Sequence, residues 1–393
     1  MRLLIVSHTP HFRQGRSFVG WGVTVREIDH LATLFDEIVH LAPVHTGSPP
    51  GSSLSYQAPN VRVCPVTPAG GPSIFSKAGV LLEVPAWAAA IRRELREADA
   101  VHVRCPANIS FLAVVMLFLM RHPRPRWVKY AGNWRPTADE SCSYRLQRWL
   151  LRQSGHGAVV TVNGRWPSLP DHVIAFHNPC LTQQELDEGR RLAGSKRLEP
   201  PFHLLFLGNL IRGKGADTAI RVAQRLCEGS SEILLEIVGD GPFRSALEDL
   251  TKERGLQDVV RFRGAMPRSS VPEVLTRAHF VLHPSRGEGF PKVLGEGMAY
   301  GAVPIAGAVS AIPQLVEETG AGIAIDPQDE QGFADAVLHF VSHEDAWSEA
   351  VQKGLAVARR LTYDAYLEDV VELFKTKFGI TLGRDCSRTS GAS

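Results

Sequence analysis

The 393-residue sequence lacks the features that mark membrane-spanning, exported or disordered proteins. Its longest uninterrupted apolar run, residues 111–120, is far shorter than the roughly 20 residues that a membrane-spanning helix needs. The opening stretch, MRLLIVSHTPHF, has no basic region followed by a long apolar segment, so we expect no export. Charged residues make up 21% and aromatic residues 8%, a balance that excludes a disordered or fibrous chain. We therefore expect a globular, cytoplasmic protein.

The sequence also lacks the common signatures of metal and hydrolase sites. Its six cysteines are scattered without a C-x-x-C pair, and in a cytoplasmic chain we interpret them as reduced thiols. Because there is no Asp-x-Asp pair, no H-E-x-x-H motif and no histidine-rich cluster, we predict no metal site. The absence of a G-x-S-x-G motif argues against a hydrolase triad.

The apolar content, 44% of the residues, is enough for more than one domain. Single cores stop growing at roughly 250–300 residues. Short β-type runs alternate with helical stretches in two series, separated by a polar break at 184–201, and such alternation favours parallel βαβ units. We predict an α/β protein with two doubly wound domains, 1–185 and 200–361, that face each other across a cleft. A helix at 362–380 should return to the first domain, and residues 381–393 should form a mobile tail.

The predicted strands follow from these β-type runs. A loop ending in Gly20 to Gly22 is expected to join the first strand to a helix over 24–35. The strands are placed at 3–8, 37–42, 61–66, 100–105, 127–131 and 158–162 in the first series, and at 203–208, 233–239, 259–264, 279–284, 303–307 and 322–326 in the second.

Charge is unevenly distributed along the chain. Residues 1–200 carry 23 Lys or Arg against 15 Asp or Glu, whereas the remainder carries 20 against 26. Most of the basic excess lies in 101–170, where ten basic residues oppose only Asp139 and Glu140. One interpretation is a buried helix followed by a solvated loop. The other is a surface over 111–165 that docks on an anionic membrane or a phosphate-bearing acceptor. We do not expect nucleic acid, because no recognised binding motif accompanies the charge.

The densest functional signal lies in residues 283–307, where a strand ends, a glycine-rich loop carries Glu288, and a helix carrying Glu296 begins. Were both glutamates helical, they would lie about 80° apart around the axis and roughly 12 Å apart along it. Two acceptors so placed could hold hydroxyl groups at the two ends of an elongated polar ligand. The amides of Gly289 and Phe290 would suit a diphosphate between them. The alternative is two surface glutamates beside a tight turn.

A second signal is the turn GNLIRGKG at 208–215, which nearly fits the phosphate-binding P-loop pattern. Gly215 stands where that pattern needs a magnesium-binding hydroxyl, so we do not predict a P-loop NTPase. Arg212 and Lys214 remain as cations that could neutralise a diphosphate without a metal, or the turn is simply solvated. The turn at 239–244 also follows a strand end; it either lines the same cleft or only starts a helix.

The first half of the chain carries weaker signals. Gly22 opens a predicted helix that could present amides to the same phosphates from the opposite side of the cleft. His102 lies near a predicted strand end, where a structural role is the more expected one.

Together these segments resemble the retaining GT-B glycosyltransferases of family 4. The resemblance is carried by EGFPKVLGE at 288–296 and by GNLIRGKGADTAI, VGDGP, RFRG and HPS in the family's order. It implies two Rossmann-like domains, with a nucleotide sugar bound mainly to the C-terminal one and the acceptor mainly to the N-terminal one. It also implies that Glu288 holds donor-sugar hydroxyls, Glu296 the ribose hydroxyls and Lys214 the diphosphate, and that backbone near Arg263 contacts the base.

The resemblance is incomplete in three places, the first of which is the N-terminal loop GWG at 20–22, which only loosely resembles the family's usual Gly-Gly turn. Asn209 stands where the family commonly has arginine, and Ala131 stands where many members have a histidine, so no catalytic histidine is carried over. The candidate catalytic residues are Glu288, Lys214 and Arg212. The candidate donor-binding residues are Gly22, Gly208, Asn209, Gly239, Gly241, Arg263, Gly289, Phe290, Pro291, Lys292, Val293 and Glu296, with His102, Asn133 and Trp134 on the acceptor side.

The resulting hypothesis is transfer of a hexosyl unit from a nucleoside diphosphate sugar to a hydroxyl acceptor, lipid-linked or glycan, with retention of configuration. The nucleotide sugar is a substrate, and no cofactor or metal is expected. The protein would work in the cytoplasm, with the inner face of the membrane as an alternative location. Two other functions stay open: a nucleotide-sugar isomerase or epimerase on the same scaffold, and a non-catalytic protein that binds sugar nucleotides.

Overall fold

The computed structural model describes residues 1–71, 74–135 and 140–383, and the chain divides into two units. The first unit contains Met1–Phe176 and the described residues from Leu367 on; the second contains His177–Tyr366. The predicted division after residue 185 is thus replaced by one after Phe176. The predicted mobile tail falls mostly on residues 384–393, which lie outside the described part.

The polar stretch predicted as a linker contains a helix of the second unit. Helix α5 (Gln183–Ala193) begins with a capping box. The Thr182 hydroxyl accepts a hydrogen bond from the Glu185 N–H at 3.1 Å, and the Glu185 carboxylate accepts one from the Thr182 N–H at 2.8 Å. The T-x-x-E pattern is visible in the sequence, and it is a stronger sign of a helix start than the surrounding polarity is of a loop.

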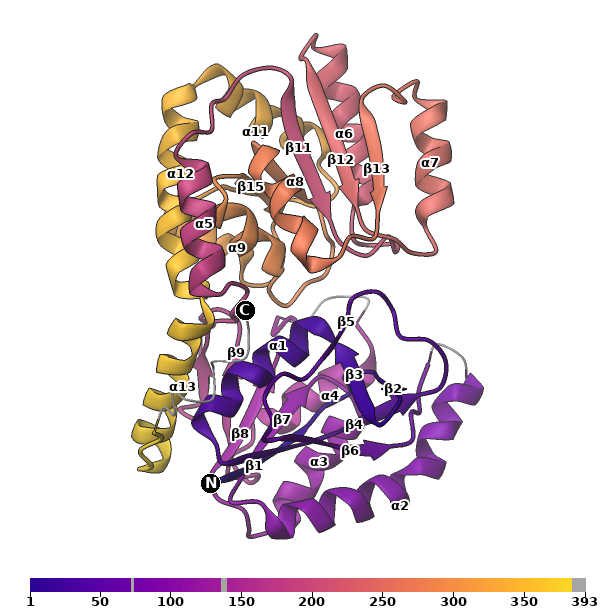
Figure 1. The fold of residues 1–393 in the computed structure, drawn as a ribbon, viewed down its shortest axis with the longest axis vertical. Helices are drawn as coiled ribbons and strands as arrows, with labels where there is room; N and C mark the ends of the chain where they lie inside the picture. The colour runs from indigo at the N-terminus through magenta and orange to yellow at the C-terminus, as the bar shows by residue number, and fades with distance from the viewer. Residues whose placement is uncertain (72–73, 136–139, 384–393) are drawn as a thin grey trace. The chain divides into compact units, whose positions relative to one another are not determined.

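The first unit is built on a sheet with helices on its faces (Figure 1). The last helix, α13 (Tyr363–Phe378), starts in the second unit, and its residues from Leu367 on belong to the first, where Phe374 packs edge-on against Phe35 and Trp127. The other elements are β1 (Arg2–Val6), β2 (His11–Gln14), β3 (Ser17–Trp21), α1 (Gly22–Leu31), β4 (Glu37–His45), β5 (Ser53–Ser55), β6 (Val61–Val66), α2 (Ile74–Glu97), β7 (Ala100–Cys105), α3 (Asn108–Leu119), β8 (Arg126–Tyr130), α4 (Cys142–Leu151), β9 (Val159–Val162) and β10 (Val173–Ala175).

The parallel strands of this sheet run in the order β6-β4-β1-β7-β8-β9-β10. Most of their residues are apolar, as a parallel sheet covered by helices favours, and Leu3 to Val6 of β1 are fully buried. The prediction of a loop before α1 is wrong. Strands β2 and β3 form an antiparallel hairpin there, β2 pairs with the end of β4, and β5 pairs with β3. These short strands lack a long apolar run, so local sequence does not reveal them.

The second unit contains a wholly parallel sheet in the order β13-β12-β11-β14-β15-β16 (Figure 1). Helix α6 packs against β12 and beside α7. The strands are β11 (Phe202–Leu207), β12 (Ile233–Val238), β13 (Val260–Gly264), β14 (Phe280–His283), β15 (Val303–Gly307) and β16 (Ile323–Ile325), and the helices besides α5 are α6 (Ala216–Glu228), α7 (Arg244–Glu253), α8 (Val271–Arg277), α9 (Lys292–Ala299), α10 (Ile312–Thr319), α11 (Glu330–Ser342) and α12 (Glu344–Ala358).

The order of the strands reverses between β11 and β14, which are neighbours in the sheet but far apart in the chain. Successive strands are added outward on one side as far as β13 and on the other side from β14 on. In open α/β sheets of this kind, ligands bind beyond the carboxyl ends of the strands at the point of reversal. The loops that follow β11 and β14 are therefore where the fold favours a ligand.

The basic segment is only partly a surface. Arg126 is 2% exposed and donates hydrogen bonds to the backbone carbonyls of Leu117, Met120, Pro123 and His156. Two more cations are also engaged internally: Lys129 binds Glu27, and Arg148 binds Glu140. The exposed residues of the segment include the arginines Arg121, Arg124, Arg135, Arg145, Arg152 and Arg165 and the apolar or aromatic residues Leu119, Tyr144, Leu146 and Trp149.

Two further sequence expectations concern membranes and thiols. Among the described helices, none combines the length and the apolar character that crossing a membrane requires. All five cysteines in the described part of the chain are free, namely Cys64, Cys105, Cys142, Cys180 and Cys227.

We predict that Arg126→Met lowers the free energy of unfolding of the first unit by roughly 2–4 kcal/mol, because buried carbonyls lose a charged donor. Arg124→Met is the matched control, since Arg124 is exposed two residues away and should change stability little. Urea unfolding followed by tryptophan fluorescence measures both. Equal losses in the two variants would contradict the internal role of Arg126.

Candidate functional site

The glycine-rich turns of the second unit lie against one another at the carboxyl ends of its strands. The Gly208 N–H donates to the Val238 carbonyl at 3.0 Å, and the Gly239 N–H donates to the Gly264 carbonyl at 2.8 Å. Gly239 has a φ of +137°, and a Cβ there would lie 1.9 Å from the Gly208 carbonyl oxygen. The turn at 239–244 therefore packs directly on the turn that follows β11, and only glycine permits this approach.

The turn after β11 also packs on the loop after β14. A Cβ on Gly215 would lie 2.2 Å from the Pro284 carbonyl oxygen, and Gly215 has a φ of +84°. The Arg286 N–H donates to the Gly213 carbonyl at 2.8 Å. This contact explains why glycine stands where a P-loop would need serine or threonine: a side chain there would separate the two loops.

Lys214 and Glu288 meet where these loops touch. The Lys214 Nζ lies 2.5 Å from the Glu288 Oε1, and the His283 Nε2 lies 3.1 Å from the same oxygen. The side chain of Glu288 is 13% exposed and that of Lys214 27%. Burial alone would raise the pKa of Glu288, but the hydrogen bonds and charges of His283 and Lys214 outweigh it and lower the pKa to about 2. Glu288 is therefore an anion at neutral pH, held at the point where the strand order reverses.

His283 was not predicted as a site residue, although the sequence contains a signal for it. It is the last residue of β14, so its side chain reaches the loop that carries Glu288. Arg212, in contrast, is exposed and does not join this group. Its guanidinium carbon lies 4.9 Å from the centre of the Phe243 ring on the neighbouring turn.

The second glutamate has a different partner. Glu296 lies in α9 with its side chain 8% exposed, and its carboxylate accepts a hydrogen bond from the Arg268 Nη1. Arg268 also lies 3.3 Å from the Glu185 carboxylate and 3.3 Å from the Cys180 carbonyl. Burial lowers the pKa of Arg268, but the two carboxylates outweigh this effect and raise the pKa above its ordinary value. Nothing in the sequence indicated Arg268, because its partners come from separate elements.

The helical spacing predicted for the two glutamates does not apply. Helix α9 begins at Lys292, so Glu296 lies in the helix and Glu288 lies in the loop before it. The angle and distance expected for two residues of one helix therefore do not describe this pair. In the described chain, the loop amides of Gly289 and Phe290 have no backbone carbonyl partner. They remain available to a ligand at the start of α9.

The other predicted donor-side residues divide into backbone and side-chain contributors. Asn209 is exposed on the turn after β11. The Arg263 side chain is engaged by Glu236, with its Nε 2.6 Å from the Glu236 Oε1. Val293 is buried in the core, and the Lys292 Nζ lies 6.0 Å from the Tyr363 ring centre. Arg263, Lys292 and Val293, like Gly241 and Pro291, can contact a ligand chiefly through their backbone, whereas the exposed Asn209 can also use its side chain.

The structure gives local partners to two candidates of the first unit, Gly22 and His102, and the full burial of His102 fits the structural role that was the more expected one. The Gly22 N–H already donates to the Ser52 carbonyl at 3.0 Å, so this amide is not free to bind a phosphate. A Cβ at Gly22 would lie 2.6 Å from the same oxygen, which explains the glycine. His102 lies inside β7, not at its end; it is fully buried, with its ring centre 3.8 Å from that of Trp127.

The remaining acceptor-side candidates serve the local structure. Trp134 is 5% exposed and packs edge-on against Tyr130, with ring centres 5.3 Å apart. The Asn133 Oδ1 accepts a hydrogen bond from the Arg135 N–H at 3.0 Å. Within residues 1–71, 74–135 and 140–383, no group of three or more His, Cys, Asp or Glu side chains is arranged to hold a metal ion.

Solved structures with the same architecture are GT-B glycosyltransferases. Sucrose-phosphate synthase from Thermosynechococcus elongatus aligns with a TM-score of 0.73 at 18% identity, over 96% of this chain and 99% of that one. Anabaena Alr3699/HepE, solved with UDP and glucose, aligns with a TM-score of 0.68 at 17% identity, over 96% and 100%. The fold of this chain is therefore GT-B.

Sequence comparison defines the family. The profile described as glycosyl transferases group 1 matches residues 192–355. The chain is 32% identical over 272 residues to an alpha-D-kanosaminyltransferase of Streptomyces kanamyceticus, covering 64% of this chain and 70% of that one. It belongs to the glycosyl transferases group 1 family and is a glycosyltransferase.

Two further relatives align over different shares of their length. A GDP-mannose:cellobiosyl-diphosphopolyprenol alpha-mannosyltransferase of Xanthomonas oryzae is 26% identical over 257 residues, or 64% of this chain and 67% of that one. A D-inositol 3-phosphate glycosyltransferase of Thermomonospora curvata is 30% identical over 199 residues, or 48% of this chain and 45% of that one. The chain thus spans less than half of the latter relative's length.

We predict that Glu288 stabilises the fold in a pH-dependent way. Because its folded-state pKa of about 2 lies below the ordinary value of 4.5, its contribution is complete above that value and is lost as the pH falls towards 2. The difference in unfolding free energy between the wild type and Glu288→Gln should therefore shrink over this window. Urea unfolding at a series of pH values measures it.

The matched control for this experiment is Glu349→Gln. Glu349 forms a surface pair with Lys353 at 2.7 Å and is largely exposed, so its removal should change stability little at any pH. A difference for Glu288→Gln that stays constant down to the acid limit would contradict the lowered pKa.

Proposed function

We propose that this glycosyltransferase moves a hexosyl unit from a nucleoside diphosphate sugar to a hydroxyl acceptor with retention of anomeric configuration. The observation that carries the proposal is the Lys214–Glu288 pair, held by packed glycine turns where the strand order reverses. The kanosaminyl- and mannosyltransferase relatives support a sugar donor. The UDP and glucose of the HepE structure support a nucleotide-linked one.

The roles of the residues follow from their charges. Lys214 and the free amides of Gly289 and Phe290 would bind the diphosphate, whose charge grows as the sugar departs. Glu288 is a paired anion, so it can accept hydrogen bonds from sugar hydroxyls, but it is a weak base. Glu296 would accept hydrogen bonds from the ribose hydroxyls. Lys214 would supply the cation that a metal provides in other enzymes.

The chemical step balances without a further reactant. The bond between the anomeric carbon and the diphosphate oxygen breaks, and its electron pair stays on that oxygen. The acceptor hydroxyl forms the new bond on the same face of the sugar. Its proton passes to the departing phosphate oxygen, so no protein base is needed. Exclusion of water would limit hydrolysis of the donor.

We propose a lipid-linked acceptor at the cytoplasmic face of a membrane as the finer form of this function. The Xanthomonas relative is named for a diphosphopolyprenol-linked acceptor. The exposed arginines at 121, 124, 145 and 152, beside exposed Leu119 and Trp149, would suit an anionic lipid surface.

We expect Lys214→Ala and Glu288→Gln each to reduce sugar transfer about 100-fold or more, because each removes a group that contacts the donor. Lys353→Ala is the matched control, since it breaks a lysine–glutamate pair on the surface of α12. Release of nucleoside diphosphate from a panel of nucleotide sugars and acceptors measures turnover, and circular dichroism checks the fold. Full turnover in both site variants would refute the assignment.

Two NMR experiments separate this function from its alternatives. Incubation with donor alone would reveal an isomerase or epimerase by a new nucleotide sugar formed without acceptor. With acceptor present, the anomeric proton coupling of the product reports whether configuration is retained. A protein that binds donors in calorimetry but releases no nucleoside diphosphate with any acceptor would be a binding protein.

We expect Arg121→Ser combined with Arg124→Ser to weaken binding to phosphatidylglycerol vesicles, by roughly 1 kcal/mol per arginine removed. The control pair is Arg254→Ser with Arg261→Ser, exposed arginines of the second unit. Co-sedimentation at low and high salt measures the effect. Wild-type protein that does not bind such vesicles at low salt would remove the membrane proposal and leave the transfer reaction untouched.

A further inference from the structure

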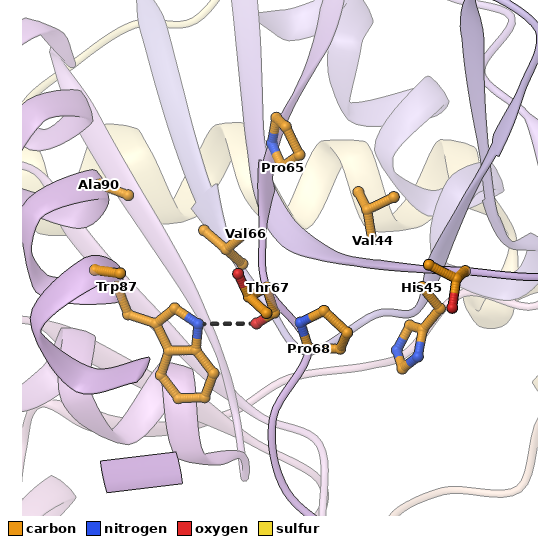
Figure 2. A pocket seen from close by; sticks show the side chains of 10 residues that line it. Val44, His45, Pro65, Val66, Thr67, Pro68, Trp87 and Ala90 are labelled. Carbon is orange, nitrogen blue, oxygen red and sulfur yellow. Dashed lines mark hydrogen bonds between the residues drawn. The ribbon is translucent and has the colours of Figure 1, made fainter. Parts of the chain in front are cut away.

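The first unit contains a pocket that is lined by none of the candidate site residues discussed above. It has a volume of about 610 Å³ and lies where β4 and β6 end, beside α2 (Figure 2). The two strands are parallel neighbours, so the pocket opens at the carboxyl edge of the sheet, where α/β folds bind ligands. Its volume falls within the roughly 300–1,000 Å³ that small-molecule sites occupy.

The lining of the pocket is mostly apolar. It consists of Val44, Pro65, Val66, Pro68, Ala86, Trp87 and Ala90, together with the polar residues His45, Thr46 and Thr67, and it contains no Lys, Arg, Asp or Glu. Figure 2 shows Trp87 and Ala90 of α2 beside the ends of the two strands. The indole N–H of Trp87 donates to the Thr67 carbonyl at 3.0 Å, so the one polar atom of that ring is already satisfied. The charged phosphates of a nucleotide would lose hydration here without gaining a lysine or arginine partner. A hydrocarbon has no polar group whose hydration would be lost on entering the pocket.

The apolar lining continues beyond the pocket along one stripe of α2. Residues four apart on a helix share a face, and Leu82, Ala86 and Ala90 follow this spacing. Ala86 and Ala90 line the pocket, whereas the Leu82 side chain is 82% exposed. The stripe thus extends a pocket of limited volume into an apolar path on the surface. An elongated apolar ligand matches this shape better than a flat ring does.

We infer that this pocket binds the hydrocarbon chain, isoprenyl or acyl, of the acceptor. The inference rests on the proposed function, because it deepens the lipid-linked acceptor suggested there. The hydrocarbon chain lies between α2 on one side and the ends of β4 and β6 on the other, and it continues along the stripe of α2 to Leu82. The mostly apolar lining, without Lys, Arg, Asp or Glu, complements a hydrocarbon chain, and the residues that would bind the donor belong to the other unit.

The first test fills the pocket. Farnesol and farnesyl phosphate are titrated into the full-length protein by calorimetry. Ala86→Trp should weaken binding of both about ten-fold or more, because Ala86 lines the pocket and is itself exposed enough to be replaced without unfolding. Ala89→Trp is the matched control: it is exposed on the same helix but does not line the pocket, and its affinity should stay within about two-fold of wild type.

The second test interrupts the apolar path. Leu81 and Leu82 are neighbours with similar exposure, 74% and 82%, but only Leu82 lies on the stripe of Ala86 and Ala90. Leu82→Ser should weaken farnesol binding about three-fold or more, and Leu81→Ser should not. Because no Lys or Arg lines the pocket, farnesol and farnesyl phosphate should bind the wild type within about three-fold of each other.

The outcomes separate this inference from the proposed function. Nucleotide-sugar turnover with a tail-free acceptor, together with farnesol binding that Ala86→Trp leaves unchanged, overturns the pocket and keeps the enzyme. Farnesol binding that Ala86→Trp abolishes, in a protein that turns over no nucleotide sugar, keeps the pocket and overturns the enzyme. If the wild type binds no farnesol, the hydrocarbon site is refuted. It is also refuted if sedimentation shows that the wild type is a dimer and that Ala86→Trp dissociates it, because the occupant of the pocket would then be a second copy of the protein.

Discussion

The ion pair between Lys214 and Glu288 is the interaction on which the candidate site depends. The two residues are 74 positions apart in the chain, and the loops that carry them follow β11 and β14, which are neighbours in the sheet. Gly215 lets the turn that carries Lys214 lie against the loop that carries Glu288, and Gly239 lets the neighbouring turn lie against Gly208. His283 adds a second bond to the same carboxylate and keeps it ionised. A side chain at Gly215 would push apart the two loops that carry the pair.

The two glutamates of the family signature are therefore not equivalent. Glu288 is held by a lysine on a loop and retains some exposure, so a sugar hydroxyl can still reach it. Glu296 is more buried and is bound by Arg268, which also ties it to Glu185 and the Cys180 carbonyl. Burial of a carboxylate is costly without a partner, so the contact with Arg268 offsets that cost and holds Glu296 in place before any nucleotide arrives.

Several elements could be predicted from the sequence because their signals are local. The strands β6, β7 and β15 coincide with their predicted ranges, since each is a short apolar run bounded by turn residues. The glycine turn after β11 and the loop after β14 were found for the same reason. The hairpin of β2 and β3 was missed because its strands are only four and five residues long, and its place depends on the pairing of β2 with β4 and of β3 with β5. The hydrogen bond of the Gly22 amide was missed because its partner, Ser52, lies on a turn that is distant in the sequence.

The sequence by itself determined the α/β class, the two series of strands and the glycine, lysine and glutamate positions at strand ends, because each depends on residues that are close in the chain. The tertiary structure decided which charges meet. It buried Arg126 among four carbonyls and brought Arg268 into contact with Glu296. It also formed a mostly apolar pocket beside β4, β6 and α2. These outcomes depend on the strand order and on side chains from separate elements, and no local pattern in the sequence records that order.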